Sequence, residues 1–285
     1  VEPPYESTMS DQPGDKPLLR IENVSVRFGG IVALDGVSFD VARGQVCGLI
    51  GPNGAGKSTL FNCLSRLYRC DTGRIRFDGH PLSTLPRHQM ASIGVGRTFQ
   101  NLALFATMTV RDNVLVGTHA HHHAGFLRNA LRLPGAARIE RGAHERAQRL
   151  IELLELGEVA ERTVADLPFG TQKRVELARA LACEPKLLLL DEPACGLNHE
   201  ELEGLGQLIV DIRQRLNLTV LLVEHHMSLV MGVSDQVVAL NFGKKIAEGT
   251  PDEVRRHPEV IRAYLGDDES EGEHESEGAR IDQAA

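Results

Sequence analysis

The sequence predicts an α/β fold in which a parallel sheet is covered on both faces by helices. Two short apolar segments, residues 187–190 and 218–223, have the length of buried strands, and a helical pattern precedes each one. Apolar strands that alternate with helices are typical of a parallel sheet with both faces buried. With 285 residues, the chain is long enough to form one large domain with a real core.

The chain before these strands has a different pattern. Short β-like stretches separated by glycine-containing turns indicate a strand-rich N-terminal part. These stretches are residues 19–27, 37–41, 45–50 and 73–77. From residue 107 to about 166 the pattern becomes helical, and residues 138–156 carry apolar side chains at helical spacing. We interpret this block as a helical insertion.

Composition narrows the classes of protein. The formal net charge is −8, but an acidic run between residues 267 and 277 carries most of it, so the rest is nearly neutral and predicts no nucleic-acid partner. The five cysteines form no C-x-x-C pair, and their odd number without a secretory signal indicates reduced thiols. No apolar run approaches the roughly 18–20 residues that cross a bilayer. We predict disordered tails at residues 1–17 and 267–285, around a folded domain at 18–266.

The strongest motif is GPNGAGKST at residues 51–59, which follows an apolar strand and opens a helix. Glycines 51, 54 and 56 allow successive N–H groups to turn inward around phosphates. Lys57 supplies a mobile charge to the β- and γ-phosphates, and Ser58 offers its hydroxyl to Mg²⁺. The motif therefore predicts a nucleotide site. The predicted contacts within it are Gly51, Asn53, Gly54, Ala55, Gly56, Lys57, Ser58 and Thr59.

A pair of acids, Asp191 and Glu192, directly follows four leucines. Ligands of open α/β sheets bind at the carboxyl ends of such strands. We expect Asp191 to hold Mg²⁺ through its water and Glu192 to polarise an attacking water. Acids also cap helices, but the phosphate loop upstream favours the catalytic interpretation.

With these motifs in order, the chain from about residue 18 to 266 resembles the ATP-binding-cassette (ABC) ATPases. The resemblance implies a RecA-like P-loop core, an N-terminal antiparallel β subdomain and an inserted helical subdomain at about 101–166. It also rests on RTFQN at 97–101, LPFGTQKRVELARAL at 167–181 and VEHHM at 223–227.

The resemblance implies roles for four further residues. Phe28 stands where the family stacks adenine, and Gln100 belongs to the loop that reaches Mg²⁺. Gly170 lies in the signature segment that contacts the nucleotide of a partner cassette. His225, at the end of an apolar strand, is expected to contact the γ-phosphate.

The segments at residues 95–117, 165–181, 194–198 and 258–266 resemble the ATPases of branched-chain amino-acid importers, whose relatives also carry urea or amides. This resemblance implies two membrane permeases, a second ABC ATPase and, indirectly, a solute-binding protein. It places the chain peripherally at the cytoplasmic face of the inner (plasma) membrane. The resemblance indicates import of a small amino-acid-like solute rather than one particular solute.

Two departures from the family pattern stand out. The consensus signature LSGGQ is replaced by residues 167–171, LPFGT, so Pro168 occupies the place of a serine and offers no hydroxyl or N–H. We expect a helix from about Thr171 to aim its positive end at phosphate, with weaker binding of the ATP that this segment completes. Asn198 replaces the usual aspartate nearby.

Alternatives remain open on the sequence alone. One alternative is a soluble ABC ATPase, but such proteins usually carry two cassettes or a long coiled coil, and this chain has one cassette and no heptad run. Another is the ATPase of a lipid or lipopolysaccharide exporter, but those keep a more consensus-like signature than LPFGT. A subunit that binds ATP with hardly any turnover is disfavoured by Glu192 and His225. We interpret the histidines of HAHHH, residues 119–123, as a solvated loop because no partner ligands complete a metal set.

Overall fold

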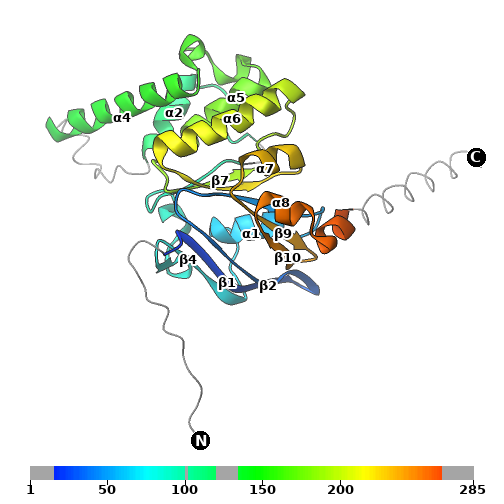
Figure 1. Ribbon diagram of the computed structural model, residues 1–285. Helices are drawn as coiled ribbons and strands as arrows, with labels where there is room; N and C mark the ends of the chain where they lie inside the picture. The colour runs from blue at the N-terminus through cyan, green and yellow to red at the C-terminus, as the bar shows by residue number, and fades with distance from the viewer. Residues whose placement is uncertain (1–15, 100–101, 120–133, 265–285) are drawn as a thin grey trace, which may run out of the picture.

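The computed structural model describes residues 16–99, 102–119 and 134–264. The predicted acidic tail, nearly all of the N-terminal tail, Gln100 and the histidines at 121–123 lie outside these ranges. The chain builds two sheets and a set of helices around them (Figure 1). The predicted mixed α/β architecture is confirmed.

A six-stranded sheet with the order β10-β9-β3-β8-β7-β6 forms the centre. Neighbouring strands pair in parallel, except that β10 pairs antiparallel with β9. They are β3 (Val46–Ile50), β6 (Val95–Arg97), β7 (Leu187–Asp191), β8 (Thr219–Val223), β9 (Gln236–Asn241) and β10 (Lys244–Gly249). Strands β3, β7 and β8 are buried along their whole length, because both faces of the sheet are covered.

The side chains of the central strands alternate between two cores. In β7, Leu188 and Leu190 belong to the core under the helices, whereas Leu187 and Leu189 belong to the core shared with the antiparallel sheet. That second sheet has the order β2-β1-β4-β5. Its strands are β1 (Leu19–Phe28), β2 (Ile31–Val41), β4 (Thr72–Phe77) and β5 (His80–Pro81).

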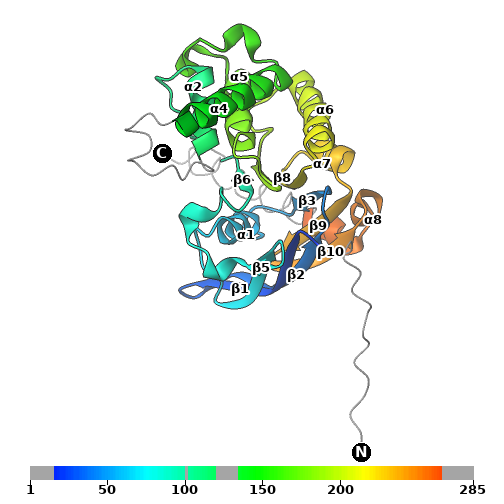
Figure 2. The same ribbon diagram turned by 90° about the vertical axis from the view of Figure 1, so that its left-hand side faces the viewer.

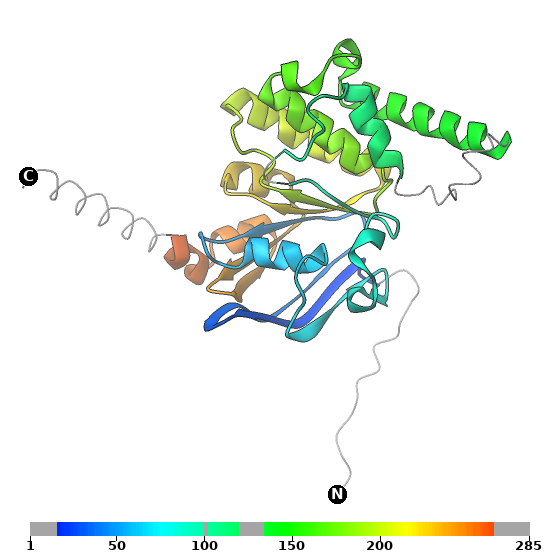
Figure 3. The same ribbon diagram turned by 180° about the vertical axis from the view of Figure 1, so that it is seen from behind.

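The helices fall into separate groups (Figures 1 and 2). Helix α1 lies between the two sheets, while α6 and α7 cover the opposite face of the central sheet. Helices α2, α4 and α5 form a lobe far from the antiparallel sheet, which Figure 3 shows from behind. Their bounds are α1 (Lys57–Leu64), α2 (Val110–Thr118), α4 (Pro134–Leu153), α5 (Phe169–Leu181), α6 (His199–Leu216), α7 (Met227–Val233) and α8 (Pro251–Arg255).

Three boundaries differ from the sequence-based expectation. Strand β2 begins at Ile31 rather than Val37, because register shifts in its pairing with β1 break the alternation of apolar side chains. The helix expected at 138–156 spans Pro134–Leu153 and is followed by Glu155 in the left-handed conformation. Helix α5 begins at Phe169, not Thr171, because the Pro168 carbonyl accepts the Gln172 N–H at 3.0 Å and closes the first turn.

Asp78 ties the antiparallel sheet to the central one. It lies in the turn after β4 and accepts hydrogen bonds from Arg43, just before β3, and from Lys186 Nζ at 2.6 Å, just before β7. These two cations hold the pKa of Asp78 at about 2, below its ordinary value of 3.8. The carboxylate therefore contributes stability that is present above pH 4 and is lost as the pH falls toward 2.

We predict that Asp78→Asn lowers the free energy of unfolding by about 1 kcal/mol at pH 7, a value reduced to allow for solvent screening. The difference from the wild type should narrow below pH 4, where the Asp78 carboxyl of the unfolded chain takes up a proton that the folded chain still excludes. Urea denaturation at pH 7, 5 and 3 measures it. The control is Asp40→Asn, which removes an exposed pair with Arg20. A deficit in Asp78→Asn that stays constant across this range would contradict the account.

Candidate functional site

The loop of residues 51–56 joins β3 to α1 and wraps around the side chain of Lys57. Lys57 Nζ donates to the carbonyl of Gly51 at 2.6 Å and to that of Pro52 at 2.9 Å, and the side chain is buried. Gly51 and Gly56 have φ angles of 149° and 102°, where an added Cβ would approach backbone oxygens at 2.2 and 2.6 Å. Only glycine fits these two positions. The result is a preformed cradle at the start of a helix, suited to phosphate.

The remaining residues of the loop motif differ in exposure. Asn53 and Gly54 are exposed on the loop, and Ser58 is exposed on the first turn of α1. Thr59 is half-buried, whereas the side chain of Ala55 is buried and leaves only its backbone for a ligand. The contacts of these residues with a nucleotide stay predictions. For Ala55, the predicted contact can involve only the main chain.

A tyrosine from the C-terminal segment holds the first residue of the loop. The N–H of Gly51 donates to the hydroxyl of Tyr264 at 2.8 Å. Tyr264 also packs against the core beneath the helices. This contact joins the end of the described chain to the phosphate loop, and sequence reasoning missed it because the two residues lie far apart along the chain.

The acid pair lies at the edge of the sheet where β3, β7 and β8 end. Asp191 is the last residue of β7, and its carboxylate pairs with Arg97 at 2.7 Å. Glu192 follows with a φ of 48°. This left-handed conformation costs a non-glycine residue about 1 kcal/mol and is a form of strain concentrated at functional sites.

The strained backbone of Glu192 brings its side chain to His225. Glu192 Oε1 lies 2.8 Å from His225 Nε2. The structure therefore joins two residues that the sequence analysis assigned to separate motifs. A carboxylate in contact with an imidazole is an arrangement that can accept and hold a proton from water.

Glu224 forms the support beneath this pair. Its side chain is 1% exposed, and Oε1 accepts the N–H of Ala194 at 2.6 Å. Oε2 accepts the N–H groups of His225 at 3.0 Å and His226 at 3.4 Å. One buried carboxylate thus fixes the loops that follow β7 and β8 relative to each other. Sequence reasoning did not single out Glu224, although an acid that ends an apolar strand was a usable signal.

Phe28 ends β1 and stays 45% exposed. The ring of Tyr68 meets it edge-on, with centroids 5.1 Å apart and an interplanar angle of 69°. An exposed aromatic face suits stacking on a base. Tyr68 was not identified from the sequence.

Gly170 does not join the phosphate loop of its own chain. It lies in the first turn of α5, where an added Cβ would meet Glu201 Oε1 of α6 at 2.8 Å. The neighbouring Phe169 ring packs on Gly196, where an added Cβ would meet Phe169 Cε1 at 2.9 Å. Asn198 caps α6 through a reciprocal pair of hydrogen bonds with Glu201, a role that the usual aspartate would fill equally well.

Oxygen donors suited to Mg²⁺ are present in Ser58 and Asp191, while the third predicted ligand, Gln100, lies outside the described residues. The carboxylate of Asp191 uses one oxygen for Arg97. Within the described ranges no group of three or more His, Cys, Asp or Glu residues could hold a metal. A hydroxyl and a carboxylate are donors that Mg²⁺ accepts alongside phosphate and water oxygens.

Comparison with known proteins agrees with this geometry. A family model described as ABC transporter matches residues 34–195, and one described as branched-chain amino acid ATP-binding cassette transporter matches residues 244–270. The chain is 46% identical over 252 residues to the high-affinity branched-chain amino acid transport ATP-binding protein BraF of Pseudomonas aeruginosa. It is 43% identical over 252 residues to LivG of Escherichia coli K12, a protein of the same description. Each match covers 88% of this chain and 99% of the relative.

Solved structures show the same fold. A nucleotide-free ATP-binding cassette from an ABC transporter superposes with a TM-score of 0.75 and 30% identity, covering 87% of this chain and 99% of that one. The ADP conformation of such a cassette also gives a TM-score of 0.75 with 30% identity, covering 88% and 99%.

We predict that Glu224→Gln lowers the free energy of unfolding by about 2 kcal/mol, because an amide N–H₂ would then face a buried backbone N–H. Thermal and urea denaturation measure the loss. Glu203→Gln is the matched control, since Glu203 lies on the exposed face of α6 with a side chain that is 76% exposed. Equal stability of the two variants would show that the buried carboxylate does not hold the two loops together.

Proposed function

Because this chain belongs to the ABC transporter ATPase family, we propose that it binds and hydrolyses ATP to energise import of branched-chain amino acids or a similar small solute. The contact between Glu192 and His225, at the sheet edge that also carries the phosphate loop, is the observation that supports hydrolysis best. The identity of 46% to an ATP-binding protein of branched-chain amino-acid transport supports the solute class.

In the proposed mechanism, Phe28 stacks on the adenine and the loop of residues 51–59 surrounds the phosphates. Lys57 exchanges its two loop carbonyls for phosphate oxygens, so its charge is already at the right place. Ser58 and Asp191, with Gln100, would hold Mg²⁺, which neutralises phosphate charge when bound.

Glu192 and His225 perform the proton handling. Water attacks the γ-phosphorus, the bond from that phosphorus to the bridging oxygen breaks, and the Glu192 carboxylate orients the water and receives its proton. His225 holds Glu192 in place through the contact between His225 Nε2 and Glu192 Oε1. His225 follows β8, at the sheet edge that also carries the phosphate loop. Phosphoryl transfer needs mainly positioning and charge stabilisation, which these groups supply.

A second cassette completes the proposed site. The signature segment around Gly170 packs on α6 of its own chain, away from the phosphate loop, so it is available to another subunit. The resemblance favours a different ABC ATPase as the partner. With Pro168 in place of a serine, the N–H groups at the start of α5 carry the proposed phosphate contact.

The proposed surface for membrane permeases follows Gln100. Phe105 and Met108 are 46% and 39% exposed, and Leu104 beside them is half-buried. Exposed apolar side chains that lie close together are typical of interaction sites. Across the described residues no helix is both long and apolar enough to span a bilayer. We therefore propose attachment to the cytoplasmic face of the inner membrane through the permeases, with a solute-binding protein acting on their other side.

We predict that Glu192→Gln lowers the rate of ATP hydrolysis by at least about 100-fold, because an amide cannot receive the proton of the attacking water. The variant should still bind ATP, since the phosphate loop is unchanged, and should accumulate as a closed pair of cassettes. Phosphate release and light scattering with ATP measure the two effects. Unchanged turnover would rule out Glu192 as the catalytic acid–base group.

The same variant tests the coupling to transport. In cells that depend on this chain, uptake of radiolabelled leucine should fall to background with Glu192→Gln and stay normal with Glu200→Gln, an exposed glutamate at the start of α6. Retained leucine uptake despite lost hydrolysis would contradict the proposed role.

A further inference from the structure

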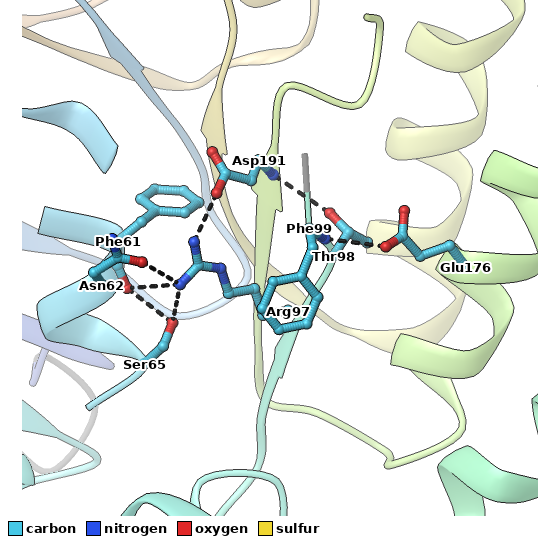
Figure 4. Close-up of polar contacts among 8 residues, drawn as sticks. All are labelled: Phe61, Asn62, Ser65, Arg97, Thr98, Phe99, Glu176 and Asp191. Atoms are coloured by element: carbon cyan, nitrogen blue, oxygen red, sulfur yellow. Dashed lines mark hydrogen bonds and ion pairs between the residues drawn. The ribbon is translucent and has the colours of Figure 1, made fainter. Parts of the chain in front are cut away.

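Three consecutive residues, Arg97, Thr98 and Phe99, connect separate parts of the molecule immediately before Gln100 (Figure 4). Arg97 ends β6, the edge strand of the central sheet. Its side chain is 10% exposed and extends from β6 toward both α1 and β7. None of the functions assigned above uses this arginine.

The guanidinium divides its hydrogen bonds between two elements. Nη1 donates to α1 and its C-cap, reaching Asn62 Oδ1 at 3.0 Å, Ser65 Oγ at 2.8 Å and the carbonyl of Phe61 at 3.4 Å. Nη2 donates to Asp191 Oδ2 at 2.7 Å. The planar fork of arginine serves both elements at once, whereas the ammonium of lysine is a single point.

Aromatic rings enclose the charge. The guanidinium carbon lies 5.7 Å from the ring centroid of Phe61 and 5.1 Å from that of Phe99. Contacts of this kind attract a cation and exclude water from it. The pair between Arg97 and Asp191 is therefore shielded, so its geometry is more restrained than that of a surface ion pair.

The neighbouring backbone fixes Asp191 further. Thr98 Oγ1 accepts the Asp191 N–H at 3.3 Å, and the Thr98 N–H donates to the carbonyl of Leu189 at 3.0 Å. With Oδ2 held by Arg97, the second carboxylate oxygen points away from the arginine (Figure 4). That oxygen is the one left to face a ligand.

The segment also reaches the signature helix. The N–H of Phe99 donates to Oε1 of Glu176 on α5 at 3.1 Å. Glu176 is 1% exposed, and burial raises the pKa of its carboxyl. The short run before Gln100 therefore contacts the phosphate-loop helix, the acid strand and α5 together.

We propose that Arg97 is a positioning residue that orients the carboxylate of Asp191 toward Mg²⁺ and ties that orientation to α1. This inference rests on the proposed function of the site as one for ATP with Mg²⁺. Groups that hold a metal-directed carboxylate typically change metal affinity about 10- to 100-fold when they are removed. Arg97 has this relation to Asp191, and its anchors on α1 lie on the helix that carries Ser58.

The test measures nucleotide binding rather than turnover. In the Glu192→Gln background, fluorescent mant-ATP is bound first in EDTA and then with increasing MgCl₂. Arg97→Met should leave the EDTA affinity within about twofold, because the phosphate loop is untouched. The Mg²⁺ concentration at half-maximal enhancement should rise about tenfold or more, and Arg97→Lys should give a smaller rise.

The matched control is Arg111→Met, since Arg111 pairs with Glu161 at 2.6 Å in the helical lobe. It should leave the Mg²⁺ response unchanged. Unchanged or tighter Mg²⁺ dependence in folded Arg97→Met would overturn the inference, because the arginine would then be structural or a competing cation. Should Arg97→Met not fold, Ser65→Ala removes one anchor of Arg97 at the C-cap of α1, together with the bond from the Ser65 hydroxyl to the Phe61 carbonyl. It should raise the half-maximal Mg²⁺ concentration roughly threefold, the effect of one hydrogen bond, and no rise would overturn the inference.

A double substitution separates positioning from general damage. In an Asp191→Asn background, adding Arg97→Met should change the Mg²⁺ response by less than about twofold, because its effect passes through Asp191. Additive losses would overturn the inference. A wild-type chain with no Mg²⁺-dependent binding of ATP would instead refute the proposed function.

Discussion

The arrangement of the site depends on one constraint, that β3, β7 and β8 are parallel and buried on both faces. Parallel strands must all end at the same edge of the sheet. The phosphate loop, the acid pair and the loop bearing His225 each follow one of these strands. The hydrophobic burial that stabilises the sheet therefore also gathers the polar groups of the site.

Buried and half-buried polar groups then fix the distances between elements that hydrophobic burial alone does not determine. Arg97 joins β6 to α1 and Asp191, Glu224 joins the loops after β7 and β8, and Tyr264 holds the first residue of the phosphate loop. Glu224 accepts backbone N–H groups, whereas Arg97 donates to a carboxylate, a carbonyl and two neutral side chains and leaves its buried Nε without a partner. Connected polar groups of this kind favour a single geometry. A cavity of about 580 Å³ lies between the helical lobe and α6, lined mainly by residues of α5, α6 and the end of α4.

Local sequence patterns predicted much of the fold but few of the contacts that hold the site residues in place. The motif at residues 51–59 and the apolar run before Asp191 are continuous in sequence, so their strands and turns were predicted correctly. Strand β6 has only three residues, and the β9–β10 hairpin was not assigned although β9 is apolar. The links made by Arg97 and Tyr264 join residues far apart in the chain, and no local pattern predicts which pairs meet. The division at 18–266 and the roles of the site residues stay predictions.

If this chain is the motor of a membrane importer, it has to be bound to membrane proteins, and these can be identified. The chain is purified through an affinity tag from detergent-solubilised membranes, and the proteins recovered with it are identified by mass spectrometry. We expect two polytopic permeases and a second ABC ATPase among the recovered proteins. Recovery only from the soluble fraction, without any membrane protein, would contradict the transporter role and leave ATP hydrolysis to be explained in another way.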